Sequence, residues 1–391
     1  MQLHLQHHSS ILEIDQTDWN ALAKDSPFLR YEFLSALENS GCIGNKTAWE
    51  PAYITIADKN SELLGALPLY IKYDSQGEFV FDWSWANAYE QAGISYYPKL
   101  ISAVPFTPAT GKRILVRNSN DFQLIAPMLL KKAKQIAEEI NASSLHILFP
   151  SDTERHFLSS KGLLQRKNCQ FHWHNREYND FDDFLKGFVS VKRKKVRRER
   201  RRIHESGIRF EHLLGDQVSE EDWEAIFDYY SLNFTRRGRA PYLNRNFFKE
   251  IAQTMPESIL IILARFENRA IATAICFQNQ NTLYGRYWGS LADFHSLHFE
   301  TCYYQGIEYC IRKGINRFEP GTQGEHKLSR GFTPVETWSN HWVNDPLFEK
   351  AIAQFVNREE AHINEYIKEL MEHVPYRNNQ RSIEPKKQNS L

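Results

Sequence analysis

At 391 residues the chain has room for two domains of ordinary size. Its 48 basic and 48 acidic residues give a formal net charge of zero. The net charge therefore gives no information about binding partners, and only local clusters of charge can do so. The hydrophobic content of 42% supports folded cores. Five widely spaced cysteines without a CxxC pair favour buried free thiols in a reducing compartment over a disulfide framework or a zinc site.

The N-terminus has no basic flank followed by an apolar run, and no apolar stretch approaches the ~18 residues of a membrane span. We therefore expect a cytoplasmic protein without a transmembrane segment. The first half of the chain predicts mixed helices and strands. In chain order these are a helix at 28–39, strands at 52–57, 63–71 and 78–85, a Tyr- and Pro-rich loop at about 86–113, a helix at 121–140 and a strand at 145–149.

The second half predicts a similar order. Its elements are helices at 220–234 and 244–253, strands at 259–265, 270–278 and 281–288, a helix at 297–313 and a strand at 316–319. Antiparallel hairpins followed by helix and strand units indicate an α/β (α+β) fold with mixed, mostly antiparallel sheets flanked by helices. The polar tail after about residue 375 is expected to be disordered.

Residues 149–175 and residues 319–344 share a sequence pattern, an internal repeat that we call the echo. Each copy starts on a proline, continues through a helix-sized polar stretch to a basic-Gly-hydrophobic turn, and closes on His-Trp. The echo predicts two copies of one domain, at 1–180 and 181–375, with a tail at 376–391. The second copy carries side chains and glycines that the first lacks, namely Glu319, Gly321, Gly324, Glu325, His326 and Lys327.

A dense basic segment, KRKKVRRERRR, opens the second copy at residues 192–202. It holds nine basic residues against one acid, Glu199, and is expected to be helical. It is either a solvated helix face held by nearby acids or a site for the phosphates of a nucleotide, CoA, tRNA or an anionic headgroup; the charge density favours phosphate binding. The candidate phosphate-binding residues are Lys194, Lys195, Arg197, Arg198 and Arg201.

The segment FEPGTQGEHKLSRGF follows a predicted strand and is the candidate reaction centre. Gly321 and Gly324 permit close approach of a ligand to the backbone. Glu325 or His326 can accept a proton from a nucleophile, and Lys327 and Arg330 can hold a phosphate or an oxyanion. The alternative is a loop and helix start in which Glu325 only complements the helix N-terminus.

Further residues are candidates for contact with a substrate, although core packing is the alternative for the aromatic ones. They are Arg286, Tyr287, His298, Glu300, Tyr304 and Glu319, together with Asp82 and Trp83 from the first copy. We expect no metal, because the histidines and glutamates lack HxxxH or HExxH spacing. The sequence also contains no GxSxG, Walker A or GxGxxG motif.

The motifs together resemble the FemAB-like branch of the GNAT acyltransferase superfamily, and within it the predicted N-acyltransferases named for peptidoglycan biosynthesis in bacteria. The motifs that carry the resemblance span residues 26–345 and include SPFLRYEFLSALENSGC, KRKKVRRERRRI, LHFETCYYQGIEYCI and RFEPGTQGEHKLSRGFTPV. The resemblance implies two tandem GNAT folds and transfer of an acyl or aminoacyl group to an amine. It also implies that Lys327, which precedes Gly331-Phe332, lies near the reaction centre.

In characterised relatives of this kind the donor is aminoacyl-tRNA and the acceptor is a peptidoglycan precursor. We therefore expect no tightly bound cofactor, a co-substrate that is aminoacyl-tRNA or acyl-CoA, and an amine acceptor that is a cell-wall precursor or small molecule. The turn GSLADFHSLHFE lacks the glycines with which ordinary GNAT enzymes hold CoA, which disfavours acetyl-CoA. An acyl-CoA-dependent enzyme acting on a small amine or lipid and a non-catalytic binding module are the alternatives. The sequence leaves the oligomeric state open.

Overall fold

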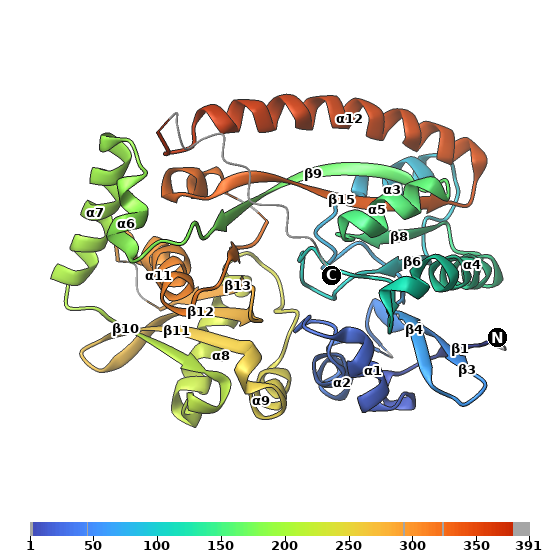
Figure 1. Cartoon of the computed structure of the whole chain (residues 1–391), viewed down its shortest axis with the longest axis horizontal. Coiled ribbons are helices and arrows are strands. Elements are labelled where there is room, and N and C mark those ends of the chain that lie inside the picture. The colour runs from blue at the N-terminus through green and yellow to red at the C-terminus, as the bar shows by residue number, and fades with distance from the viewer. Residues whose placement is uncertain (1–2, 45, 292–293, 323, 378–391) are drawn as a thin grey trace. The chain divides into compact units, whose positions relative to one another are not determined.

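The computed structural model describes residues 3–44, 46–291, 294–322 and 324–377 (Figure 1). The chain forms two compact units. Unit 1 consists of residues 1–168, 242–251 and 336–364, and unit 2 of residues 169–241, 252–335 and 365–391. Among the described residues, no helix has both the length and the apolar character needed to cross a membrane.

Unit 1 contains two groups of paired strands. The first has the order β1-β3-β4-β7, and the second ends in the order β15-β8-β6-β5-β2. The strands are β1 (Leu3–His8), β2 (Trp49–Pro51), β3 (Tyr53–Asp58), β4 (Leu63–Leu67), β5 (Tyr70–Lys72), β6 (Lys99–Ser102), β7 (Leu115–Val116), β8 (Ser144–Leu148) and the end of β15 (Thr333–Val343). Helices α1 (Gln16–Ala23), α2 (Tyr31–Asn39), α3 (Trp83–Gln91), α4 (Phe122–Glu139) and α5 (Asp152–Ser160) lie within this unit, and parts of α9 (Arg245–Thr254) and α12 (Pro346–Glu372) join it.

Helix α4 shows why these segments fold as they do. Ile125, Leu129, Ala133 and Ile136 recur every three or four residues, so they share one face, and all are buried. That face packs on β3, β4 and β8 and belongs to a core cluster of unit 1.

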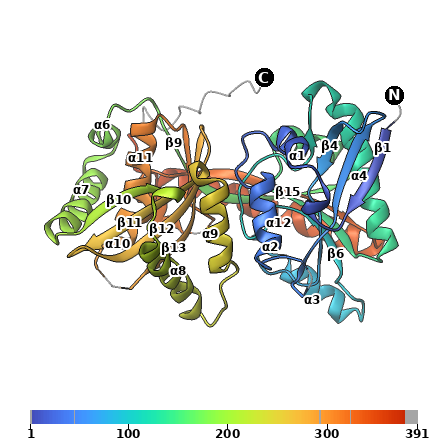
Figure 2. The same ribbon diagram turned by 90° about the horizontal axis from the view of Figure 1, so that it is seen from below.

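Unit 2 is built on strands in the order β10-β11-β12-β13-β14-β9 (Figure 2). The strands are β10 (Arg209–Leu214), β11 (Ile259–Phe266), β12 (Arg269–Gln278), β13 (Thr282–Ser290), β14 (Arg317–Glu319) and the end of β9 (Leu164–His174). Its helices are α6 (Phe181–Lys186), α7 (Ser190–Glu205), α8 (Glu220–Thr235), α10 (Leu297–Phe299) and α11 (Gln305–Lys313), with a π-helical turn at Glu300–Tyr304 and a 3₁₀ helix at Glu325–Arg330. Neighbouring strands are antiparallel except for the parallel pair β13–β14.

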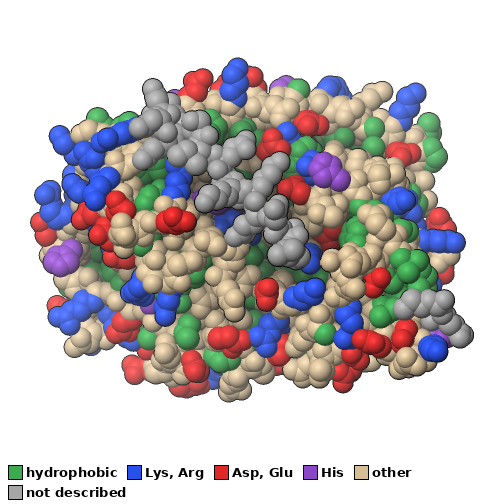
Figure 3. All heavy atoms as spheres, in the orientation of Figure 1, with side chains coloured by type: hydrophobic (Ala, Val, Ile, Leu, Met, Phe, Trp, Pro, Cys, Tyr) green, Lys and Arg blue, Asp and Glu red, His purple; other side chains and the backbone are tan. Residues whose placement is uncertain are grey.

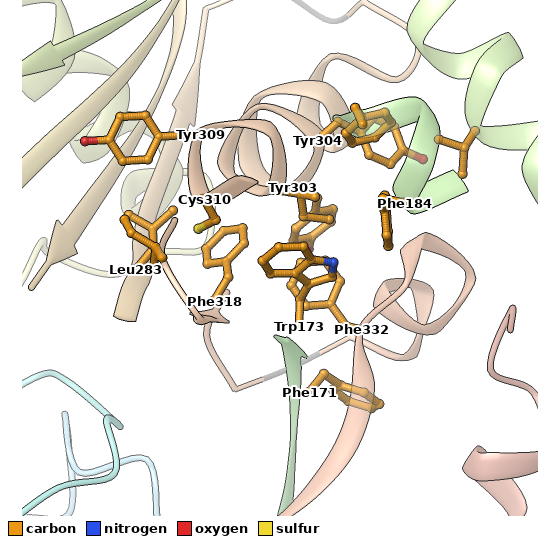
Figure 4. Close-up of a cluster of buried hydrophobic side chains, with 14 of the residues drawn as sticks. Phe171, Trp173, Phe184, Leu283, Tyr303, Tyr304, Tyr309, Cys310, Phe318 and Phe332 are labelled. Atoms are coloured by element: carbon orange, nitrogen blue, oxygen red, sulfur yellow. The ribbon is translucent and has the colours of Figure 1, made fainter. Parts of the chain in front are cut away.

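Aromatic side chains dominate the core of unit 2, as Figure 4 shows. Trp173 of β9, Tyr303 of the π-helical turn and Phe332 before β15 come together there from segments distant in sequence. The rings of Tyr303 and Phe332 meet edge to face with centroids 5.4 Å apart, a favourable geometry for aromatic pairs. The helix after β13 and the segment after β14 therefore both pack into this core.

The echo corresponds to a repeated structural order: strand, helix, glycine with positive φ, long strand. The first copy runs β8, α5, Gly162 and β9, and the second runs β14, the 3₁₀ helix, Gly331 and β15. Each long strand also passes from one compact unit into the other, because β9 ends beside β14 and β15 ends beside β8. The compact units are consequently not contiguous in sequence, and the repeat limits of 1–180 and 181–375 stay a prediction.

Most predicted elements are confirmed within a few residues, and four differ. The loop expected at 86–113 is wrong in part, because it contains most of α3 and the strand β6, whose residues are buried. The strand expected at 78–85 is wrong: helix α3 starts at Trp83, because Trp85 and Tyr89 lie four residues apart and bury one helical face. The strand expected at 63–71 divides around Pro68, which has no N–H for a ladder bond. The helix expected at 297–313 contains the π-helical turn.

The expected disordered tail begins within ordered structure. Tyr376 is buried, and its hydroxyl donates to the Gly331 carbonyl at 2.6 Å. The remainder of that tail, residues 378–391, lies outside the described residues.

Candidate active site

Helix α7 carries the basic segment and presents two contrasting faces. Val196, Glu199 and Ile203 recur at spacings of three and four residues and are buried, so they form the inward stripe. The cations occupy the rest of the helix surface, and blue side chains gather over this part of unit 2 in Figure 3. The burial of a carboxylate within the inward stripe indicates that Glu199 has partners in the unit.

A cavity of about 380 Å³ lies between α7, the start of α10 and the 3₁₀ helix. Its lining residues are Lys195, Arg198, Glu199 and Arg202 of α7, His295 and Phe299 around the start of α10, and His326, Ser329 and Arg330 of the 3₁₀ helix. Lys195, Arg198 and Arg202 follow one another at spacings of three and four, so they form a row roughly 10 Å long at 1.5 Å per helical residue. We call these three residues the cationic row.

His326 faces this cavity and has partners that orient its ring. Its Nε2 lies 2.8 Å from the Tyr303 hydroxyl. Burial lowers the pKa of His326 below its ordinary value, and the charges of Lys327 and Arg330 lower it further. The imidazole is therefore neutral at neutral pH and has a lone pair that can accept a proton.

Arg330 connects His326 to the inward stripe of α7. Its Nη2 donates to Glu199 Oε1 at 2.9 Å, and its Nη1 donates to the His326 carbonyl at 2.7 Å. The second oxygen of Glu199 accepts a short hydrogen bond from the Tyr304 hydroxyl. The guanidinium also lies over the Phe299 ring, 3.3 Å from its centroid. The contacts of Glu199 thus connect α7 to the π-helical turn, through Tyr304, and to the 3₁₀ helix, through Arg330.

Lys327 is not among the residues that line the cavity. It is 2% exposed, and its Nζ donates to the Gly321 carbonyl at 2.7 Å. Burial lowers the pKa of Lys327 to about 7; the Cys302 thiol raises it, and the Arg286 charge lowers it further. Lys327 therefore holds the turn after β14 closed while its own charge is poorly stabilised.

Glu325 and Gly324 complete the turn. Glu325 is exposed, and its Oε1 accepts a hydrogen bond from the Tyr366 hydroxyl of α12 at 2.8 Å. Gly324 has φ of 110°, and a Cβ at this position would lie 2.3 Å from the His326 ring. Glycine is therefore required here both for the backbone and for the placement of the imidazole.

The pairing between β13 and β14 ends beside this turn. The parallel register runs from Thr282↔Arg317 to Tyr284↔Glu319, where β14 ends, whereas β13 continues to Ser290. The predicted residues Arg286 and Tyr287 lie on that extension, and the Tyr287 ring contacts Tyr230 at 5.0 Å.

Glu319 is 4% exposed at the end of β14, with an oxygen 3.0 Å from Arg317 Nε. Its other oxygen is 4.0 Å from His172 Nε2. The carboxylate therefore belongs to a buried polar group beneath the turn, and its role toward a substrate stays a prediction.

Several predicted residues lie elsewhere in unit 2. Arg197, Arg201 and Glu300 line a second cavity of about 530 Å³ on another side of α7, and Lys194 lines neither cavity. Glu300 is 3.1 Å from Arg200 Nε, so its carboxylate helps to hold α7. His298 stacks edge to face between Trp288 and Tyr303, and burial lowers its pKa to about 4.

Asp82 and Trp83 belong to unit 1. Asp82 is buried, pairs with Lys99 and accepts a hydrogen bond from the Tyr96 hydroxyl at 2.6 Å. Trp83 is 45% exposed at the start of α3. Their predicted role as a wall of a cleft stays a prediction.

Sequence reasoning missed five residues of the first cavity: Glu199, Arg202, His295, Phe299 and Ser329. The spacing Val196, Glu199, Ile203 was a usable signal, because it places the only acid of the basic segment on the apolar stripe. The other four depend on the fold around the helix, which local spacing does not show.

A mixed α+β fold with mostly antiparallel sheets flanked by helices, which is similar to the fold of FemX, defines the class of this protein. The chain belongs to the FemAB-like family, described as peptidoglycan biosynthesis/recognition, which matches residues 10–378. The predicted family and fold class are thus confirmed. Membership supports an acyl or aminoacyl transferase. No match was found among curated proteins.

Solved structures show the same fold at low sequence identity. FemX is similar over 89% of this chain and 99% of that chain, with 13% identity and a TM-score of 0.54. The C-terminal domain of a putative lysylphosphatidylglycerol synthetase from Agrobacterium fabrum covers 88% of this chain and 94% of its own, with 12% identity and a TM-score of 0.50. At these identities the likeness is one of fold.

Proposed function

We propose that the protein is an N-acyltransferase that moves an acyl or aminoacyl group from a phosphate-bearing donor to an amine. The observation that carries the proposal is one cavity bordered by the cationic row on one side and by His326 on the other. Cations arranged along a helix suit the phosphates of aminoacyl-tRNA or acyl-CoA. A neutral imidazole beside them suits removal of a proton from an attacking amine.

The proposed reaction forms a C–N bond and breaks the ester or thioester bond of the donor. The amine attacks the donor carbonyl, and the proton it loses passes to His326. The proton then leaves with the departing 3′-hydroxyl of tRNA or the thiol of CoA. In the tautomer whose Nε2–H donates to the Tyr303 oxygen, Nδ1 is the atom that accepts the proton.

The geometry favours His326 over Glu325 as proton acceptor. His326 lines the cavity, whereas Glu325 does not and is bonded to Tyr366. Lys327 is likewise absent from the lining and contacts the Gly321 carbonyl, so we assign it to holding the turn. The positions of Glu325 and Lys327 are compatible with a pure binding module, but such a module has no need of an oriented neutral imidazole beside the cationic row.

Family membership supports a cell-wall precursor as the amine acceptor and aminoacyl-tRNA as the donor. An acyl-CoA donor would use the same cationic row. Titration calorimetry of the full chain with charged tRNA, acetyl-CoA and a longer acyl-CoA separates these donors. Binding that falls steeply with salt and is restricted to tRNA would reject the CoA version.

The decisive variant is His326→Gln, assayed with whichever donor binds. We expect kcat to fall by roughly 10²–10⁴-fold, the usual contribution of a general base, with donor affinity nearly unchanged. The matched variant Arg198→Ala should instead weaken donor binding and its salt dependence. Full activity of His326→Gln would reject this mechanism, and the absence of turnover in wild type with every donor and amine would favour the binding module.

A further inference from the structure

We propose that Glu199 is a positioning residue, which through Arg330 fixes His326 against the cationic row of α7. Its catalytic consequence rests on the proposed function, whereas the placement of His326 can be tested without any substrate. Nothing in the basic composition of the segment suggests such a role for its one acid.

The contacts of Glu199 use both carboxylate oxygens. The residue is 5% exposed; Oε1 accepts from Arg330 Nη2 at 2.9 Å, and Oε2 accepts from the Tyr304 hydroxyl. A buried ion pair of this kind costs solvation of both charges, and removal of one partner leaves the other uncompensated. Arg330 therefore depends on Glu199 for its place.

Arg330 in turn sets the position of His326. Its Nη1 donates to the His326 carbonyl, so the backbone that carries the imidazole is bonded to the side chain that Glu199 holds. The π-helical turn contributes two further contacts: the Tyr303 hydroxyl lies 2.8 Å from His326 Nε2, and the Tyr304 hydroxyl donates to Glu199.

The charges around His326 affect its pKa, which can be measured. Charged or titratable groups from four elements surround His326. Its own helix contributes Glu325, Lys327 and Arg330, and the segment around the start of the helix after β13 contributes His295, His298 and Tyr303. Helix α7 contributes Lys195, Arg198, Glu199 and Arg202, and α12 contributes Tyr366, which is bonded to Glu325. The Arg330 charge lowers the pKa of His326. Because the Glu199 carboxylate is paired to that guanidinium, we expect it to offset part of this effect.

Two substitutions in the same ion pair should therefore shift the His326 titration in opposite directions. In Glu199→Gln the Arg330 charge is uncompensated, so the pKa of His326 should fall. In Arg330→Gln the cation is lost, so the pKa should rise. A purely structural role would disturb both variants alike, without opposite shifts.

The test is NMR titration of the full chain labelled with ¹⁵N-histidine, in which His326 is identified by the resonance that His326→Gln removes. Glu205→Gln, an exposed acid on the same helix, is the matched control and should leave the titration unchanged. If Glu199→Gln does not fold, Glu199→Asp retains the charge at a greater distance from Arg330 and should shift the pKa in the same direction by less. Equal shifts in both pair variants, or none, would overturn the proposal.

Activity provides a second, separable readout. With a working donor, Glu199→Gln should lower kcat at least tenfold, with the acid limb of the pH profile moved down, and should change the donor KM less than twofold. If the wild type transfers nothing, the proposed function fails while the NMR result still decides the positioning role. Unchanged kcat in a folded Glu199→Gln variant would count against the inference.

Discussion

Lys327 and Arg330 are both buried and lie three residues apart, but the positive charges of the two side chains are stabilised to different degrees. Each is 2% exposed, but Arg330 has the Glu199 carboxylate at 2.9 Å, whereas the hydrogen bond of Lys327 goes to a neutral carbonyl. A carbonyl does not replace the solvation that a buried ammonium loses. The pKa of Lys327 therefore falls to about 7, close to the pH at which the protein would work.

The lowered pKa of Lys327 predicts a pH-dependent stability. The unfolded lysine has the ordinary value of 10.5, so between pH 7 and 10.5 the unfolded chain binds more protons than the folded one. The free energy of unfolding should rise with pH across this window, with a slope of at most ~1.4 kcal/mol per pH unit. Lys327→Met should lose this slope and be more stable than wild type near pH 7.

Urea unfolding at pH 7, 8.5 and 10 measures this difference. Equal pH slopes for the wild type and Lys327→Met would show that Lys327 keeps its charge in the folded protein.

At the level of elements, the two copies of the echo diverge at their helices. In the first copy Ser151 and Glu154 form a capping box, so α5 begins as a regular helix. In the second copy Gly324 has no side chain with which to cap, and the segment forms a 3₁₀ helix with Lys327 directed to Gly321. The sequence predicted one helix-sized stretch in each copy, and cap chemistry decided the difference.

The glycines that end these helices provide a matched test. Gly162 and Gly331 both have positive φ, 82° and 97°, and both precede a long strand. A Cβ at Gly162 would meet nothing within 4 Å, whereas a Cβ at Gly331 would lie 2.5 Å from Cζ of Phe184. Gly162→Ala should cost ~1–2 kcal/mol from backbone strain alone, and Gly331→Ala should cost a further ~1–3 kcal/mol from overpacking.

Urea unfolding of the two alanine variants gives both values. Equal losses would mean that α6, which carries Phe184, moves away without cost.

At the scale of the whole molecule, β15 brings a histidine from the second copy of the echo into unit 1. His341 of β15 and His146 of β8 are both buried, and their Nδ1 atoms lie 2.6 Å apart. One of the two must donate and the other accept, so the accepting ring must be neutral. Burial lowers the pKa of His146 to about 3 and that of His341 well below its ordinary value.

This pair predicts loss of stability in acid. Below the ordinary value of 6.5 the unfolded histidines bind protons that the folded ones exclude, so the free energy of unfolding should fall as pH drops from about 6.5 toward 3. His341→Gln should show a shallower acid slope, even if it is less stable at pH 7. Chemical unfolding of unit 1 at pH 7, 6 and 5, followed by its tryptophans, measures the slopes; a slope unchanged by His341→Gln would contradict the assignment.

The sequence by itself determined the family and most of the helices and strands, because these depend on local periodicity, turn residues and long motifs. The apolar spacing of α4 and the glycines of the segment after β14 are read directly from neighbours in the chain. The prediction of a strand at 78–85 failed, because packing of Trp85 and Tyr89 produces a helix there.

Only the tertiary structure decided which side chains share a site. The faces of α7 are distinguished by what packs against them, so Arg198 and Arg202 border the cavity with His326 while Arg197 and Arg201 border another. Glu199 and Arg330 are 131 positions apart in the chain, and no local pattern connects them. Side-chain direction around a helix follows the buried face, and the buried face is set by contacts between distant segments.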